Sequence, residues 1–122
     1  MSCWREQTVL RLPAKAIGIH TMEEWYRFER EYEDRMDWEE GCFAPSLCTY
    51  EHGPFLDYIL KDRAPVQGNG CDYDARPLTP AERRKYLPVF QRMFPGFTRE
   101  QMEDVHYCEC IWYDGTEAPY CY

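Results

Sequence analysis

The chain has 122 residues, with 14 Lys and Arg against 22 Asp and Glu, a formal net charge of −8 and 44% hydrophobic residues. This length supports one hydrophobic core, and the 10 Tyr, 6 Phe and 4 Trp exclude a disordered chain, because disordered sequences are poor in aromatic residues. The longest apolar runs are far shorter than the roughly 20 residues of a membrane span. The negative charge argues against direct binding of nucleic acid and favours a basic partner.

The seven cysteines are an odd number, which leaves one thiol unpaired if disulfides form. The N-terminal residues 1–7 lack the charged and apolar regions of a signal peptide. We therefore expect a cytoplasmic protein with reduced thiols, located in the host cytoplasm if a phage encodes it.

The first half of the sequence predicts one or two strands and then a helix. Thr8–Leu12 is a strand candidate, which residues 16–20 extend after a bend at a proline. Thr21 and Glu24 have capping-box spacing, so they predict the start of a helix that stops near Gly41. Its predicted buried stripe consists of Met22, Trp25, Phe28, Tyr32 and Met36.

Residues 41–78 are rich in glycine and proline, and we expect a loop-rich excursion from the single core. Pro54 is placed to begin a short helix that runs to Leu60. Residues 64–70 are predicted to form a loop.

The strongest helix start in the chain is Thr79-Pro80-Ala81-Glu82, with a cap, a proline at the first helical position and an acid at the third. Pro88 predicts a kink or a break near Leu87, since proline removes an amide donor inside a helix. The residues expected to face inward are Tyr86, Val89, Phe90, Met93 and Phe94.

The last third predicts a short helix and a strand. Thr98 and Gln101 cap the helix, and residues 105–113 form the best strand candidate, followed by a hairpin turn predicted at Asp114-Gly115. The whole pattern predicts an α+β fold: one small domain, with helices packed on a short antiparallel sheet.

The negative charge is concentrated between Met22 and Glu40, where nine acids and three arginines give a net charge of −6. Carboxylates spaced along one element can imitate a phosphate backbone and engage rows of Lys and Arg on a nucleic-acid-binding protein. The alternative is an ordinary solvated helix, because three acid–arginine pairs have four-residue spacing: Glu23 with Arg27, Arg30 with Asp34, and Glu31 with Arg35.

The end of this segment has the fewest arginines, so we predict the partner-binding residues there. They are Glu33, Asp34, Asp37, Glu39 and Glu40, with Trp38, Trp112 and Tyr113 as aromatic anchors.

A second candidate site consists of His106, Cys108 and Cys110, which would share one face of a strand. Two thiolates and an imidazole can bind zinc, although Cys-x-Cys is a weaker signal than the usual spacings. The fourth ligand would come from Cys42, Cys48, Cys71, Cys121 or His52. A buried apolar strand face is the alternative interpretation.

A third candidate is a nucleophilic cysteine, such as Cys71 in the loop 68–71, with His20 or His106 as its base. Nothing in the sequence brings these residues together in space.

Three classes of function follow, and the sequence favours the first, a non-enzymatic protein that binds and blocks a basic, nucleic-acid-binding site on another intracellular protein. Inhibitors encoded by phages and mobile elements, including anti-CRISPR and other anti-defence proteins, commonly take this form, which is an analogy at the level of class. A small zinc-stabilised adaptor is the alternative, and a thiol-dependent enzyme comes third.

Overall fold

The computed structural model of the chain describes residues 4–46, 54–66 and 72–113. Within them, five strands form one antiparallel sheet in the order β2-β3-β1-β5-β4. The strands are β1 (Trp4–Pro13), β2 (Phe43–Ser46), β3 (Phe55–Val66), β4 (Asp72–Pro77) and β5 (His106–Tyr113). The helices are α1 (Met22–Tyr32) and α2 (Pro80–Met93), with 3-10 turns η1 (Ala14–Ile17), η2 (Glu33–Arg35) and η3 (Gln101–Asp104). The predicted α+β class is confirmed.

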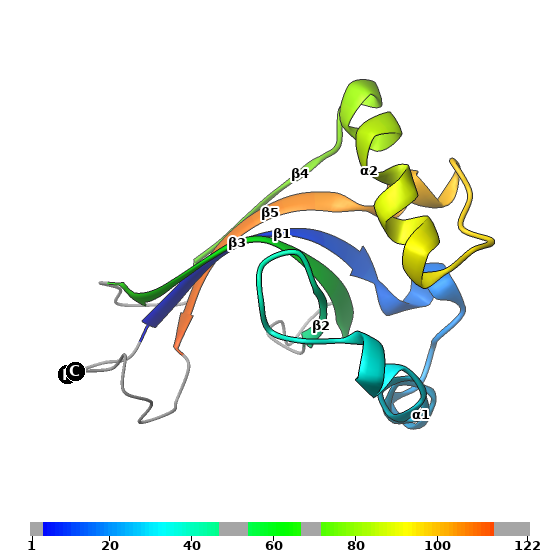
Figure 1. The fold of residues 1–122 in the computed structure, drawn as a ribbon, viewed down its shortest axis with the longest axis horizontal. Coiled ribbons are helices and arrows are strands. Elements are labelled where there is room, and N and C mark those ends of the chain that lie inside the picture. Colours follow the sequence, from blue (N-terminus) through cyan, green and yellow to red (C-terminus); the bar gives the residue numbers. More distant parts are fainter. Residues whose placement is uncertain (1–3, 47–53, 67–71, 114–122) are drawn as a thin grey trace.

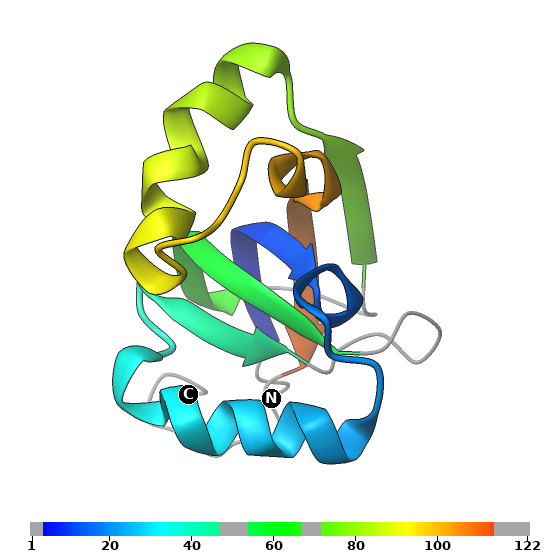
Figure 2. The same cartoon turned by 90° about the vertical axis from the view of Figure 1, so that its right-hand side faces the viewer.

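The main core lies between the sheet and the helical layer. Figures 1 and 2 show α1 and α2 at the same end of the sheet but apart from each other, with η1 and η3 between them. The core residues come from every part of this layer: Leu10, Leu12, Trp25, Phe28, Phe43, Leu56, Phe90, Met93, Phe97 and Met102. Each helix therefore contributes an apolar stripe, and the charged residues of α1 and α2 remain on the outside.

The opposite face of the sheet is also buried, and it is partly polar. Val9, Ala44, Ile59 and Cys108 form a small apolar cluster there. Beside it, Arg11 and Asp57 are joined by two hydrogen bonds of 2.8 Å, and both are almost completely buried. The Arg11 guanidinium also lies over the Phe55 ring, 4.9 Å from its centroid. Burial raises the pKa of the Asp57 carboxyl, and the hydrogen bonds and charge of Arg11 oppose that shift.

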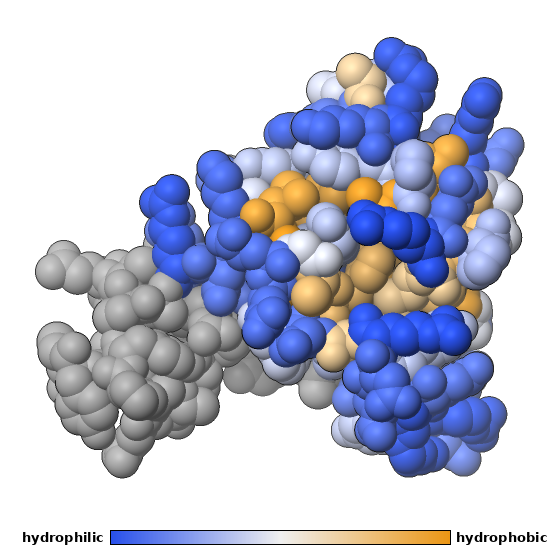
Figure 3. Space-filling view, in the orientation of Figure 1, coloured by the Kyte–Doolittle hydropathy of each residue, from blue (hydrophilic) through white to orange (hydrophobic). Residues whose placement is uncertain are grey.

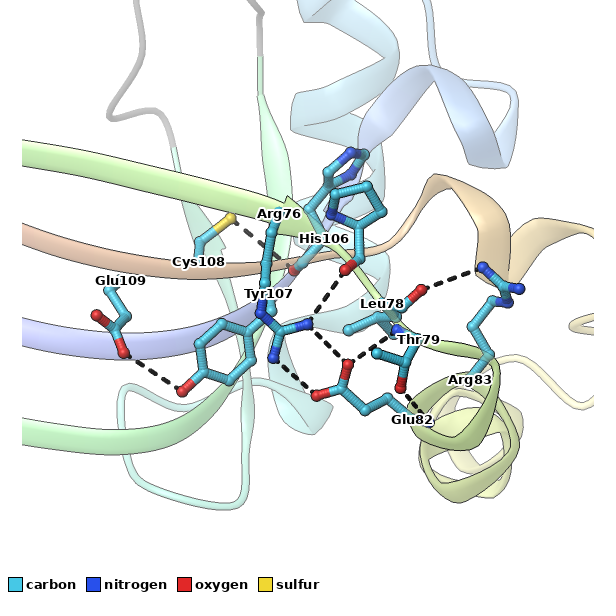
Figure 4. A network of polar contacts seen from close by, with 10 residues as sticks. Arg76, Leu78, Thr79, Glu82, Arg83, His106, Tyr107, Cys108 and Glu109 are labelled. Atoms are coloured by element: carbon cyan, nitrogen blue, oxygen red, sulfur yellow. Dashed lines mark hydrogen bonds and ion pairs between the residues drawn. The ribbon is translucent and has the colours of Figure 1, made fainter.

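The start of α2 agrees with the sequence in detail. Thr79 Oγ1 accepts a hydrogen bond from the Glu82 amide, and Glu82 accepts one in return from the Thr79 amide. Figure 4 shows that Glu82 also accepts two hydrogen bonds from Arg76, of 2.7 and 2.9 Å, which tie the helix to β4. Pro88 does not break α2, since the helix is continuous to Met93. Burial of Phe90 and Met93 holds it together.

Four other predictions about the elements were wrong. Residues 55–60 belong to β3, not to a short helix, and residues 14–17 form the turn η1 where the second strand was expected to begin. The segment 41–78 as a whole supplies β2, β3 and β4, and the loop predicted over 64–70 is wrong at residues 64–66, which belong to β3. The fourth difference is the end of α1 at Tyr32, nine residues before Gly41.

The strand over 105–113 is confirmed. Thr98 and Gln101 exchange the hydrogen bonds expected of a cap, but the helical turn that follows is the 3-10 turn η3, which has Glu100 as its N-cap. The predicted hairpin at Asp114-Gly115 lies outside the described residues, as does the loop 68–71.

Candidate partner-binding site

The acidic residues at the end of the predicted helix lie on a separate loop, residues 33–42, which we call the acidic loop. Residues 33–40 carry five carboxylates and one arginine, a net charge of −4. The loop begins with η2 and then crosses back to β2, and its charged side chains are all exposed. In Figure 3 the surface around α1 and η2 is almost entirely hydrophilic.

Backbone hydrogen bonds fix both ends of the acidic loop. At its start, Met36 is partly buried against the core and bridges to Phe43, and the Asp37 amide donates to the Phe43 carbonyl at 2.9 Å. At its end, the Gly41 amide donates to the Ile59 carbonyl at 2.8 Å. Gly41 has φ 80°, a conformation that residues with a Cβ adopt only at a cost. The loop is therefore a defined part of the fold.

Two of the five carboxylates stabilise the loop itself. Asp37 Oδ1 accepts a hydrogen bond of 2.7 Å from the Trp38 amide, and Glu40 Oε1 accepts one of 3.0 Å from the Asp62 amide on β3. Since these oxygens already have partners inside the molecule, Asp37 and Glu40 are less available to another protein than the sequence suggested.

The other three carboxylates, of Glu33, Asp34 and Glu39, are exposed. No side chain in the described part of the chain lies within ion-pair or hydrogen-bond distance of them. The Trp38 side chain beside them is 45% exposed, a large fraction for so apolar a group. Three available charges and one available indole therefore share one short loop.

The arginines of α1 neutralise this loop less than their spacing predicts. Of the three predicted ion pairs, only Glu23 with Arg27 is present among the described residues; its nitrogen and oxygen atoms are 3.8 Å apart, and both side chains are largely exposed. The α-helix ends at Tyr32, so four-residue spacing no longer aligns side chains across η2. Arg35 lies instead over the Tyr32 ring, 5.2 Å from its centroid.

An open groove runs along the other side of α1 and has a volume of about 630 Å³. Phe28 and Tyr32 line it from α1, and Phe94 and Phe97 line it from the segment after α2. These rings pack against one another, with centroids 4.7 to 6.2 Å apart. Its walls are mixed, since Glu24, Arg27 and Glu31 line it together with the rings.

Trp112 and Tyr113 do not belong to the acidic loop. Their backbone lies at the end of β5, where Arg5 pairs with Trp112 and Trp4 pairs with Tyr113. The loop is tied to β3, on the far side of β1, so two strand spacings separate it from these residues. Of the predicted aromatic anchors, the structure places only Trp38 with the acids.

The predicted metal ligands share a strand face, but most of that face is buried. Cys108 and Cys110 are 0% and 3% exposed, and Cys108 packs in the apolar cluster with Val9 and Ile59. The Nδ1 atom of His106 lies 3.2 Å from the Asp104 carbonyl oxygen. Across residues 4–46, 54–66 and 72–113, no three His, Cys, Asp or Glu side chains are placed to hold one ion. Cys48, His52, Cys71 and Cys121 lie outside those ranges.

The structure does not test Cys71 as a nucleophile, because Cys71 lies outside the described residues. Cys42 is half-buried and lines a cleft of about 240 Å³ with Arg35, Tyr58 and Arg92. None of the described residues that line this cleft is a histidine, so the geometry supplies no base for the Cys42 thiol.

Comparison with known proteins adds no functional information. No helix in the described part of the chain is both long and apolar enough to cross a membrane. No protein-family model matches the chain, and neither a curated protein nor a solved structure is significantly similar to it.

Proposed function

We propose that this protein is a non-enzymatic binding protein whose acidic loop engages, and thereby blocks, a basic nucleic-acid-binding site on another protein. The observation that carries the proposal is the combination of Glu33, Asp34 and Glu39 with the exposed Trp38 on a loop fixed at both ends. A fixed loop loses little conformational freedom on binding, so more of its interaction energy appears as affinity.

The two kinds of side chain have different roles in such a contact. Exposed carboxylates attract Lys and Arg and speed the encounter, but single exposed ion pairs contribute only about 0.2–1 kcal/mol. A tryptophan that is desolvated at the centre of an interface commonly contributes about 2 kcal/mol or more. Trp38 is therefore the expected affinity anchor, and the carboxylates select a basic partner. The groove along α1 offers further contact area outside the acidic loop.

The test is affinity capture from cells that naturally make the protein, followed by measurement of binary affinity with the purified captured protein. The test variant carries Glu33→Gln, Asp34→Asn and Glu39→Gln, which leave the tethering residues intact. The matched control carries Glu103→Gln, Asp104→Asn and Glu109→Gln, which remove the same charge from exposed positions outside the loop.

We expect the loop variant to lose affinity and the control variant to keep it. Binding should weaken between about 50 and 500 mM salt, because the Debye length that screens exposed charges falls from roughly 14 Å to roughly 4 Å over this range. It should also compete with the nucleic acid that the captured protein binds. If the loop variant binds as tightly as the wild type in both salts, the acidic loop is not the site and the proposal is wrong.

Trp38→Ala separates the anchor from the charges. We expect it to lower affinity by about tenfold or more while leaving the salt dependence unchanged. An unchanged affinity would show that the contact is electrostatic only, and would refute the anchor role of Trp38.

A further inference from the structure

A second surface has the opposite charge. The helix α2 carries Arg83, Arg84, Lys85 and Arg92 against a single acid, Glu82, which gives it a net charge of +3 in a chain of −8. The first half of α2 faces η3 across a groove of about 320 Å³, within the roughly 300–1,000 Å³ range of ligand clefts. We call it the arginine groove, after Arg83, Arg84 and Arg99, which line it.

The arginine groove also has apolar walls. Pro80 and Leu87 line it from α2, and Met102 lines it from η3. Met102 is almost completely buried, so its position is fixed by the core. A ligand for this groove should therefore combine negative charge with an apolar or aromatic group, because guanidinium groups bind carboxylates and also stack on aromatic rings.

The guanidinium groups that line this groove are not neutralised within the fold. Figure 4 shows Glu82 engaged with Arg76 and Thr79, while Arg83 donates to the Leu78 carbonyl at 3.1 Å. In the described residues, no carboxylate lies within 4.0 Å of Arg83, Arg84 or Arg99. Glu100 and Glu103 line the same groove without forming ion pairs, so its lining has a net charge of +1, and the Arg84 and Arg99 side chains have no hydrogen-bond or ion-pair partner among the described residues.

The complementary chemistry is present on the same chain. The acidic loop carries three available carboxylates around the exposed indole of Trp38. Figures 1 and 2 both place η2, which starts that loop, beside the end of α1, while the arginine groove lies along the first half of α2, at the opposite end of the helical layer. The two surfaces therefore cannot meet within one molecule.

We propose that the arginine groove is a docking site for the acidic loop of a second copy of this chain. Trp38 of one copy would lie against Pro80 and Leu87 of the other, with the loop carboxylates facing Arg84 and Arg99. Such a contact joins two different surfaces, so it is head-to-tail and either closes into a ring or extends into a chain. It would also cover the surface that binds a foreign partner, so self-association and partner binding would compete.

Charge-swap variants test this proposal. The loop variant carries Glu33→Lys, Asp34→Lys and Glu39→Lys, and the groove variant carries Arg84→Glu and Arg99→Glu. All five positions are exposed, so we expect both variants to fold, which circular dichroism and thermal melting would check. Sedimentation and light scattering would measure the mass of each protein in solution, for comparison with the monomer mass of 14.7 kDa.

We expect the wild type to self-associate at about 20 mM salt and to dissociate at about 500 mM. Each variant alone should be monomeric, with its association constant at least about tenfold lower. An equimolar mixture should assemble again, because the native loop meets the native groove and the lysine loop meets the glutamate groove. A monomeric wild type, or variants that associate by themselves, would overturn the proposal. So would a mixture that stays monomeric.

The same variants separate this inference from the proposed function, on which it does not depend. The groove variant should keep its affinity for the captured basic partner, since it retains the acidic loop. A labelled single-stranded oligonucleotide provides a further arm. If the wild type is monomeric and binds the oligonucleotide through Arg84 and Arg99, the groove serves nucleic acid and the self-docking proposal is wrong.

Discussion

The buried ion pair between Arg11 and Asp57 gives the sharpest prediction about stability. Asp57→Asn keeps the shape of the side chain but removes the charge that faces Arg11 across two hydrogen bonds of 2.8 Å. The two side chains are 2% and 4% exposed, so water cannot replace the lost interaction. Removing one member of a buried pair costs about 3–5 kcal/mol, a large part of the roughly 5–15 kcal/mol that stabilises a domain.

We therefore expect Asp57→Asn to lower the melting temperature by roughly 12–20 °C, at about 4 °C per kcal/mol for a chain of this length. Thermal and urea unfolding, followed by circular dichroism, would measure it. Arg27→Gln is the control, because it removes an exposed pair with a distance of 3.8 Å and should cost less than about 0.5 kcal/mol.

The double variant Arg11→Met with Asp57→Leu tests the reason for the loss. Replacing a whole buried pair by apolar side chains is often neutral, so we expect the double variant to unfold within about 1 kcal/mol of the wild type. If Asp57→Asn costs less than about 1 kcal/mol, or if the double variant is as unstable as the single one, the destabilisation does not come from an uncompensated charge.

Three further predictions concern pH, the backbone and metal. The Arg76 guanidinium, together with hydrogen bonds from Thr79, lowers the pKa of Glu82 from 4.5 to about 2. The stability that the wild type has over the Glu82→Gln variant should therefore be complete above about pH 5 and be lost as the pH falls towards 2. Thermal unfolding of both proteins at a series of pH values would measure it. Gly41→Ala should cost about 1–2 kcal/mol in urea unfolding, since its φ is 80°, whereas Gly96→Ala, which has open space and an ordinary φ, should be neutral or slightly stabilising. Finally, we expect fewer than about 0.5 zinc ions per chain by elemental analysis and no change in melting temperature with chelator; a full equivalent of zinc would support the adaptor hypothesis instead.

Local signals predicted the elements that local chemistry determines. The cap at Thr79 and the proline after it marked the start of α2 to the residue, and the aromatic run 105–113 marked β5. The sequence wrongly predicts a helix over 55–60, because a short apolar run does not show its period. In the structure Phe55, Leu56 and Ile59 are all buried, and so is Asp57, which pairs with Arg11, so this part of β3 shows no alternation of buried and exposed residues.

The end of α1 was missed for a related reason. Met36 fits the helical stripe by spacing, but it reaches the core from an extended residue after η2. The acidic site was predicted as five equivalent carboxylates, because the sequence gives position and charge only. Asp37 and Glu40 hold the loop because they accept hydrogen bonds from the amides of Trp38 and Asp62. Asp62 is far from Glu40 in the sequence, so no local pattern encodes that contact.

The two outer strands of the sheet affect how the protein can assemble. β2 has only four residues and includes Pro45, while β4 ends in Pro77 and carries Asp and Arg. Proline offers no amide for strand pairing, and short or charged edges discourage one sheet from adding to another. Assembly by strand addition, the usual route to aggregation of sheet proteins, is therefore disfavoured at both edges. A concentrated solution should accordingly form contacts that salt can reverse and that leave the β-sheet content unchanged in infrared spectra.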